Sequence, residues 1–267
     1  MKNVFITAAL AAAALVSCGP KYAEPTSTPG SEIAYSMSFI RHVAANVDKN
    51  ENIVISPYSA GVALSMLAEG AEGQTKEEFN KALNDCLFKA EELGGNDTVI
   101  VNSVNSLWVD DNFSIRNRYL FLLDKDYDAL ATTLNFSDPA TVQAINNWCS
   151  EHTNGKIKDI IDRLGAGDVM VLANALYFNA PWLNPFDSNL TTKADFNGSK
   201  GQTKVDMMSR KGYMNYAEFQ GCQLVELPYE GGRYSMFVSK SPSILGSEKA
   251  SFIITITFGI LFLFFSS

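Results

Sequence analysis

The stretch Val169-Met-Val-Leu-Ala-Asn-Ala-Leu-Tyr-Phe178 decides how the rest of the chain is interpreted, because it is apolar along its length apart from Asn174. It shows neither the alternation of a half-buried strand nor a helical stripe. Gly165 and Gly167 precede it, and Pro181 follows it. An apolar run of this length between helix breakers predicts a strand that is buried on both faces.

Asn174 places an amide side chain in the middle of this predicted strand. An amide that is buried without a partner costs on the order of 1–3 kcal/mol. We therefore expect Asn174 to have a dedicated hydrogen-bond partner. The simplest interpretation is a structural amide that bonds to a neighbouring strand, and a functional role remains open beside it.

Composition and charge limit the classes of protein that fit. A chain of 267 residues can form one large domain or two small ones. It is 46% hydrophobic and 19% charged, which is typical of a globular domain with a substantial core. The formal net charge is −8 and no run of Lys or Arg occurs, so the sequence argues against nucleic acid as a partner.

The N-terminus predicts export. In residues 1–18, Lys2 supplies a positive charge and Val4–Val16 form an apolar segment that is too short to span a bilayer. The segment ends in Leu15-Val16-Ser17-Cys18, which resembles a bacterial lipoprotein signal in which Cys18 is acylated. An ordinary signal peptide that is cleaved nearby is the alternative.

Residues 19–31 are rich in Pro, Ser, Thr and Gly and predict a flexible tether. Lipid on Cys18 would contribute about 0.8 kcal/mol of membrane affinity for each buried methylene. We therefore expect the membrane to be a partner through Cys18. The expected location is the bacterial envelope, facing the periplasm or the exterior, or else the extracellular space.

The first part of the mature chain carries clear signals for local structure. Asn52-Ile-Val-Ile55 predicts a short strand. Ser56 and Pro57 then predict a helix start that continues to Gly70, with Ser as N-cap and Pro in the first turn. Thr75-Lys-Glu-Glu78 has the spacing of a capping box and predicts the start of a further helix.

Further helices and strands follow from apolar periodicity and turn residues. Helices are expected over Ile33–Val47, over Ile115–Asp126 and from Asp138-Pro139 onward. Strands are expected over Val101–Val109, Leu130–Phe136, Val205–Met208, Tyr213–Tyr216, Gln223–Tyr229 and Tyr234–Val238.

Two of these motifs resemble the serpins, the family of serine protease inhibitors. Leu172-Ala-Asn-Ala-Leu-Tyr-Phe-Asn-Ala-Pro-Trp182 resembles the third strand of the serpin main sheet and the turn after it. Asn52-Ile-Val-Ile-Ser-Pro-Tyr-Ser59 resembles the family's strand and helix start near the N-terminus. The motifs occur in family order, so the resemblance implies an α+β fold, a partial serpin domain over residues 32–238 with mixed β-sheets and surrounding helices that lacks the family's C-terminal strands and reactive loop.

The resemblance also suggests site residues. Ser56, Ser59 and Asn174 match the family's shutter, which lies under the main sheet and helps it to open. Trp182 matches the breach at the top of that sheet. Each of these residues also has a plain structural interpretation. Ser56 can be a helix cap, Ser59 a first-turn hydroxyl, Asn174 a strand amide and Trp182 a packed aromatic. The structural and the family interpretations can hold together.

Residues 239–267 form a divergent apolar tail, and no hinge, reactive loop or further main-sheet strand resembling the family's follows. Phe252–Phe265 is shorter than the roughly 20 residues of a membrane helix and is rich in β-branched and aromatic residues, which favour strands. Three interpretations are open: a frameshifted or truncated gene product, a membrane-associating tail, or a substitute strand at the missing edge.

The family's mechanism implies a serine-type endopeptidase as partner, with cysteine-type endopeptidases as a second class. In that mechanism the cleaved reactive loop inserts beside the strand that matches Val169–Phe178. The 267 residues hold no such loop, so we expect the chain as it stands to be inactive. A non-inhibitory lipid-anchored envelope or binding protein, or a non-functional truncated product, is the alternative.

The sequence gives no support for an enzyme, a cofactor or a metal site. It has two histidines, His42 and His152, each in a predicted amphipathic helix. It lacks a Gly-x-Ser-x-Gly elbow, a phosphate-binding glycine loop and a His-Glu-x-x-His motif. Cys86, Cys149 and Cys222 are widely spaced, so we expect free thiols that are mostly buried.

Overall fold

The structure is a computed structural model of the chain. It describes residues 31–47, 53–90, 96–198, 201–219, 221–241, 251–257 and 261–266. The predicted signal peptide of residues 1–18, its Cys18 and most of the tether lie outside the described residues.

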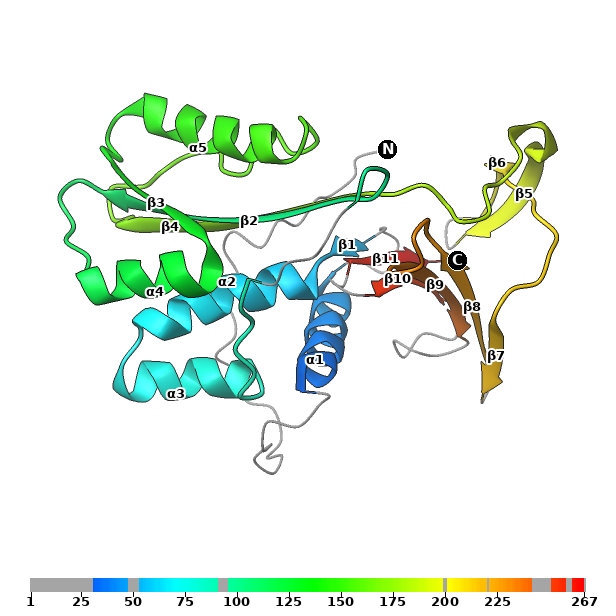
Figure 1. Cartoon of the computed structure of the whole chain (residues 1–267), viewed down its shortest axis with the longest axis horizontal. Helices are drawn as coiled ribbons and strands as arrows, with labels where there is room; N and C mark the ends of the chain where they lie inside the picture. Colours follow the sequence, from blue (N-terminus) through cyan, green and yellow to red (C-terminus); the bar gives the residue numbers. More distant parts are fainter. Residues whose placement is uncertain are drawn as a thin grey trace.

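Helices and strands separate into two regions, in keeping with the predicted α+β class (Figure 1). One region has a three-stranded sheet between helices, and the other has a six-stranded sheet. The helices are α1 (Ser31–Asn46), α2 (Pro57–Gly70), α3 (Gly73–Ala82), α4 (Asn117–Tyr127) and α5 (Pro139–His152).

The three-stranded sheet has the order β3-β2-β4. Strand β2 (Ile100–Asp110) is parallel to β3 (Ala129–Leu134) and antiparallel to β4 (Met170–Asn179). Helices α2 and α4 lie on one side of this sheet and α5 on the other (Figure 1).

The apolar stretch around Asn174 forms β4, as predicted. Leu172 and Leu176 pack against the core cluster that contains residues of α2 and α4. Ala173 and Ala175 belong to the cluster on the opposite face, with residues of α5. The strand is buried on both faces at Ala173–Ala175 and partly exposed towards its ends, so the prediction is confirmed for its central part.

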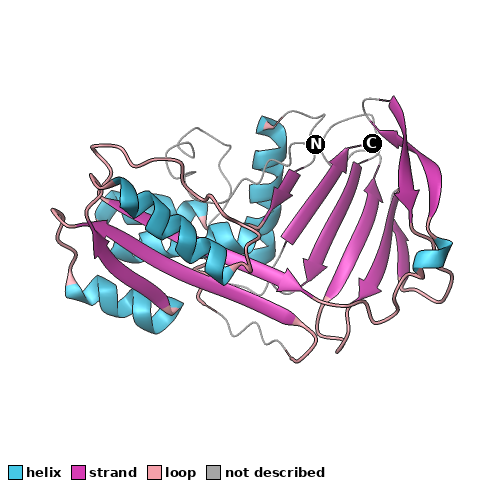
Figure 2. Cartoon of the chain, turned by 90° about the horizontal axis from the view of Figure 1, so that it is seen from above, coloured by secondary structure: helices cyan, strands magenta, loops and turns pink. Residues whose placement is uncertain are grey.

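The six-stranded sheet has the order β1-β11-β10-β9-β8-β7, and its strands run side by side in Figure 2. All of its pairings are antiparallel. Its strands are β1 (Ile53–Ile55), β7 (Tyr216–Phe219), β8 (Cys222–Pro228), β9 (Ser235–Ser241), β10 (Ser251–Thr257) and β11 (Leu261–Ser266).

The apolar tail supplies two of these strands. Strand β10 pairs with β9 and with β11, and β11 pairs with β1. The backbone of the tail thus has the strand conformation that its β-branched and aromatic residues favour. The substitute-strand interpretation placed the tail at the missing edge, whereas these strands complete the other sheet. No helix among the described residues is long and apolar enough to cross a membrane.

Two local predictions were wrong. Helix α3 begins at Gly73, its N-cap residue Glu72 makes no side-chain cap bond, and Thr75 lies inside the helix, so the predicted capping box does not form. Strand β7 begins where the strand predicted for Tyr213–Tyr216 was expected to end. No sequence pattern predicted β5 (Thr192–Gly198), which pairs with β6 (Gly201–Met207) as a two-stranded hairpin.

Candidate functional site

The outer edge of β4, meaning the side that faces away from β2, is the candidate site. In the part of the chain that the structure describes, no strand pairs with this edge. Met170–Asn179 contains no charged residue and no proline. Such an edge presents unpaired N–H and C=O groups and is a template for an added strand.

A chain of side-chain hydrogen bonds joins β4 to its neighbours. The Asn174 amide nitrogen donates to Asn105 Oδ1 at 2.8 Å and to Ser103 Oγ at 3.3 Å. Asn105 Nδ2 in turn donates to the Tyr127 carbonyl at 2.7 Å, at the end of α4. The expectation that Asn174 has a dedicated partner on a neighbouring strand is therefore confirmed.

The other half of the Asn174 amide lacks a partner in the described structure. Asn174 is only 7% exposed, and its Oδ1 is buried and accepts no hydrogen bond. A buried acceptor of this kind carries a desolvation cost. This strand therefore holds one polar atom at its centre that an approaching donor could satisfy.

Ser56 and Ser59 lie at the start of α2. Ser56 is the N-cap residue, and its Oγ accepts the Ser59 backbone N–H at 3.1 Å, so the predicted cap is confirmed. Ser59 is buried. No hydrogen bond joins either serine to Asn174 within the described residues, and the shutter role that the resemblance suggested for the three stays a prediction.

Trp182 lies just beyond β4 in an aromatic cluster. Its ring stacks on Tyr229 with centroids 4.4 Å apart and an angle of 11°, and it meets Phe186 edge-on at 6.2 Å. Phe178, at the end of β4, meets Tyr229 and Tyr234 edge-on. These aromatic contacts join the end of β4 to the six-stranded sheet.

Sequence reasoning selected Trp182 alone from this cluster. It missed Tyr229 and Tyr234, which flank a turn containing two glycines and are buried. Burial raises the pKa of Tyr229 to about 12. The packed-aromatic interpretation of Trp182 is confirmed, and its breach role stays a prediction.

A cavity of about 480 Å³ lies at the opposite end of β4. Phe113, Phe136 and Leu164 form apolar parts of its wall, and Asp110 and Asp168 lie beside them. Hydrogen bonds from the Phe136 backbone N–H and then from Asn112 hold the pKa of Asp110 below its ordinary value. No sequence signal pointed to this cavity.

Among the described residues, no group of three or more His, Cys, Asp or Glu side chains is placed to bind a metal ion. The His152 ring lies against the Trp148 ring with centroids 4.8 Å apart and planes tilted by 36°, and its Nδ1 lies 2.7 Å from the Trp148 carbonyl oxygen. Cys86, Cys149 and Cys222 form no disulfide, as predicted, but only Cys149 is buried, so the expectation that these thiols are mostly buried was wrong. Burial raises the pKa of Cys149 to about 11, so its thiol is protonated at neutral pH.

Comparison with known proteins identifies this arrangement. The family model "Serpin (serine protease inhibitor)" matches residues 31–240. An uncharacterised serpin-like protein of Thermococcus kodakarensis is 33% identical over 219 residues, covering 77% of this chain and 51% of that protein. Antichymotrypsin-2 of Bombyx mori is 32% identical over 225 residues, covering 75% and 58%. The chain thus spans about half the length of the curated relatives it matches.

Solved structures agree with this result. The native state of tengpin, a thermophilic serpin, matches with a TM-score of 0.73 and 27% identity, covering 82% of this chain and 59% of that one. An Arabidopsis serpin in its native stressed conformation matches with a TM-score of 0.71 and 27% identity, covering 78% and 58%. The chain therefore belongs to the serpin family.

Proposed function

We propose that the protein is an endopeptidase inhibitor of the serpin type that works by insertion of an extended segment beside β4. The observation that supports this function is the open edge of β4, which is ten residues long and uncharged. An extended segment added there gains main-chain hydrogen bonds, and its side chains alternate between the two faces of the sheet. Serine-type endopeptidases are the proposed partners, and cysteine-type endopeptidases are a second class.

The inserted segment would have to come from outside these 267 residues. The 267 residues contain nothing that resembles the family's hinge or reactive loop. We therefore expect these residues alone to trap no protease, although they carry the receiving strand.

The experiment tests covalent protease inhibition and strand binding at the β4 edge separately. The purified chain is incubated with trypsin, chymotrypsin, subtilisin and papain, and covalent complexes are sought on denaturing gels; we expect none. An extended Glu- and Ala-rich peptide of about ten residues is then added, and we expect the melting temperature to rise. The same peptide with N-methylated backbone amides cannot donate hydrogen bonds and serves as the control.

Each result has a clear meaning. Equal melting temperatures with both peptides would show that the edge of β4 accepts no strand, which would remove the basis of the proposal. A covalent protease complex formed by the 267 residues would overturn the expected inactivity and would call for a search for the cleaved bond within this sequence.

A second candidate function rests on the N-terminal sequence. Ser17-Cys18 after an apolar segment supports a lipid-anchored envelope protein that binds partners without inhibiting them. Growth of the producing bacterium with an alkyne-tagged fatty acid should label the full chain and place it in the membrane fraction. Cys18→Ala should abolish both, and label that survives this substitution would exclude Cys18 as the anchor.

A further inference from the structure

The cavity at the start of β4 is bounded by three connections of the chain that meet at this end of the three-stranded sheet. They are the turn after β2, the turn between β3 and α5, and residues 164–169, which lead into β4. The Asp110 N–H donates to the Val169 carbonyl and the Asp111 N–H to the Leu134 carbonyl, both at 3.0 Å. These bonds hold the three connections together, and none of the lining residues lies on the outer edge of β4.

Two carboxylates line the cavity, and N–H donors of the same connections hold both in place. Asp110 Oδ1 accepts the backbone N–H and the side-chain amide of Asn112, and Asp110 Oδ2 accepts the Phe136 N–H, all at 3.0 Å. Asp168 Oδ2 accepts the Gly165 N–H at 2.7 Å, and within the described structure Asp168 Oδ1 accepts no hydrogen bond. A carboxylate has about four acceptor positions, so each of the two can accept a further donor.

Apolar side chains form much of the remaining wall. Phe136 and Leu164 pack against the core cluster that contains residues of α5. Phe113 and Val169, in contrast, are 43% and 40% exposed. Because exposed apolar surface gains free energy when a ligand covers it, these two side chains favour a ligand with an apolar body.

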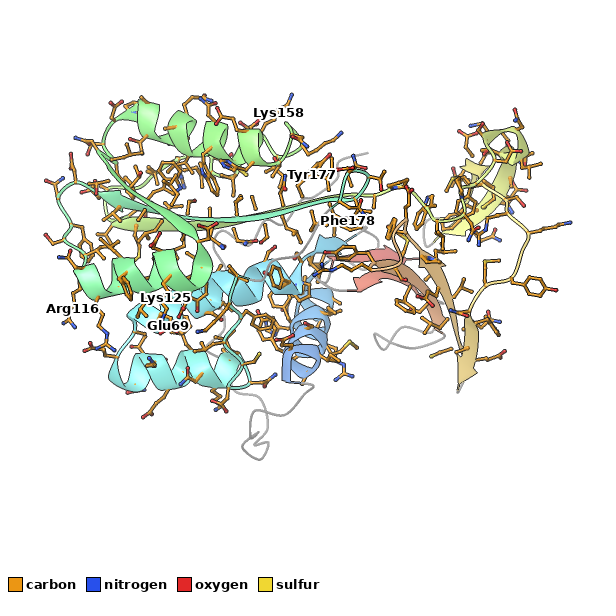
Figure 3. All side chains as sticks on the ribbon, viewed as in Figure 1. Glu69, Arg116, Lys125, Lys158, Tyr177 and Phe178 are labelled. Atoms are coloured by element: carbon orange, nitrogen blue, oxygen red, sulfur yellow. The ribbon has the colours of Figure 1, made fainter. Side chains whose placement is uncertain are left out.

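No positively charged side chain is among the described residues that line the cavity. Arg116 follows the turn after β2, but its guanidinium pairs with Glu72 at 2.8 Å, and Figure 3 shows it at the start of α4. Lys158 and Tyr177 lie towards the other end of β4 in the same figure. The two carboxylates of the cavity therefore have no cation of the lining as a partner.

We propose that the cavity binds a small organic ammonium ion with a compact aromatic or branched apolar body. The ammonium group donates to the free acceptor positions of Asp110 and Asp168, and the apolar body contacts Phe113 and Val169. Hydrogen bonds between charged groups are about twice as strong as neutral ones, so the carboxylates select a cation. A volume of about 480 Å³ is within the range of small-molecule sites.

The first test compares three probes that share one aromatic ring. The full chain carrying Cys18→Ser, which removes the candidate lipid site, is titrated in a calorimeter with phenethylamine, phenethyl alcohol and phenylacetate. We expect phenethylamine to bind with a dissociation constant of about 1 mM or lower, as suits a ligand with so few atoms. The neutral alcohol and the anion should bind at least about tenfold more weakly.

The second test changes the cavity. Asp168→Asn removes a charge but keeps an oxygen that can accept the Gly165 N–H, and it should weaken phenethylamine binding about tenfold. Phe113→Ala should weaken it several-fold because apolar contact is lost. Asp124→Asn on α4 is the matched control, since Asp124 is exposed and does not line the cavity, and it should leave the affinity unchanged. The melting temperature of each free variant shows whether it is folded.

The third test locates the bound probe by amide NMR. Phenethylamine should shift the signals of residues 164–169 and of the turn after β2, and Asp168→Asn should reduce these shifts. The absence of binding, equal affinity for the three probes, or shifts confined to other parts of the chain would each overturn the proposal. So would unchanged affinity in a folded Asp168→Asn protein. If this variant does not fold, the three probes on the unsubstituted cavity decide. The inference does not rest on protease inhibition, because neither protease nor peptide is present.

Discussion

Asn174 stabilises the sheet through one half of its amide and leaves the other half unused. Replacing it by Ala removes the donor to Asn105 Oδ1, which is buried between β2 and β4. We expect Asn174→Ala to lower the free energy of unfolding by about 1–3 kcal/mol, measured by urea denaturation.

Asn179→Ala is the control on the same strand, because the Asn179 amide is exposed and reaches only the Tyr177 hydroxyl at 3.2 Å. Its effect should stay within about 0.5 kcal/mol. Equal losses in the two variants would contradict a special role for the buried amide.

Helix α2 is stabilised by a side-chain cap at its start, whereas helix α3 has no such cap. Ser56→Ala removes the side chain that accepts the Ser59 N–H, and we expect a loss of about 1 kcal/mol in unfolding free energy. Thr75→Ala alters an exposed position inside α3 that makes no cap and should have little effect. A larger loss from Thr75→Ala would mean that the predicted capping box forms in solution after all.

Strand β10 is held on both sides, since it pairs with β9 and with β11. Thr255 lies within both pairings, and proline at this position removes a backbone donor from the ladder. We expect Thr255→Pro to lower the free energy of unfolding by at least about 1 kcal/mol. Thr255→Val keeps both the N–H and the branched shape and should be near neutral; equal stability of the two variants would place the tail outside the sheet.

For the whole molecule, alkali should reveal the buried phenols. Burial, and then the charge of Glu69, raise the pKa of Tyr119 to about 12, and burial alone does the same for Tyr229. A raised pKa favours the folded state while the phenol is protonated, so this stabilisation is complete below about pH 10 and is lost as the pH rises towards 12.

Absorbance of phenolate near 295 nm should therefore rise in two phases, the later one together with unfolding. Tyr177→Phe should reduce the early phase, because hydrogen bonds with Asn154 and Asn179 hold the pKa of Tyr177 below its ordinary value. Tyr119→Phe and Tyr229→Phe should reduce the late phase. A single phase near pH 10 in the folded protein would contradict the burial of both phenols.

The sequence predicted most of the three-stranded sheet because its signals are local. The apolar stretch around Asn174, the Ser56 cap and the Asp138-Pro139 helix start each depend on a few adjacent residues. The predictions failed where tertiary contacts determine the local structure. Thr75 had the right spacing for a cap but lies inside α3, and the polar β5 pairs with β6 without an apolar pattern to mark it.

The candidate site was only partly accessible to sequence reasoning. Family motifs selected Asn174 and Trp182, but the stacking partner Tyr229 lies almost fifty residues beyond Trp182. The open edge of β4 could be anticipated, because no part of this sequence resembles the further main-sheet strands of the family.

The place of β11 beside β1 has a consequence for how the chain is made. Ile53 pairs with Phe264, more than two hundred positions later in the sequence. Strand β1 is therefore synthesised long before its partner. The six-stranded sheet cannot close until β11 has left the ribosome, and closing so large a loop is slow. During that interval the nascent chain holds unpaired strand edges, which favour aggregation.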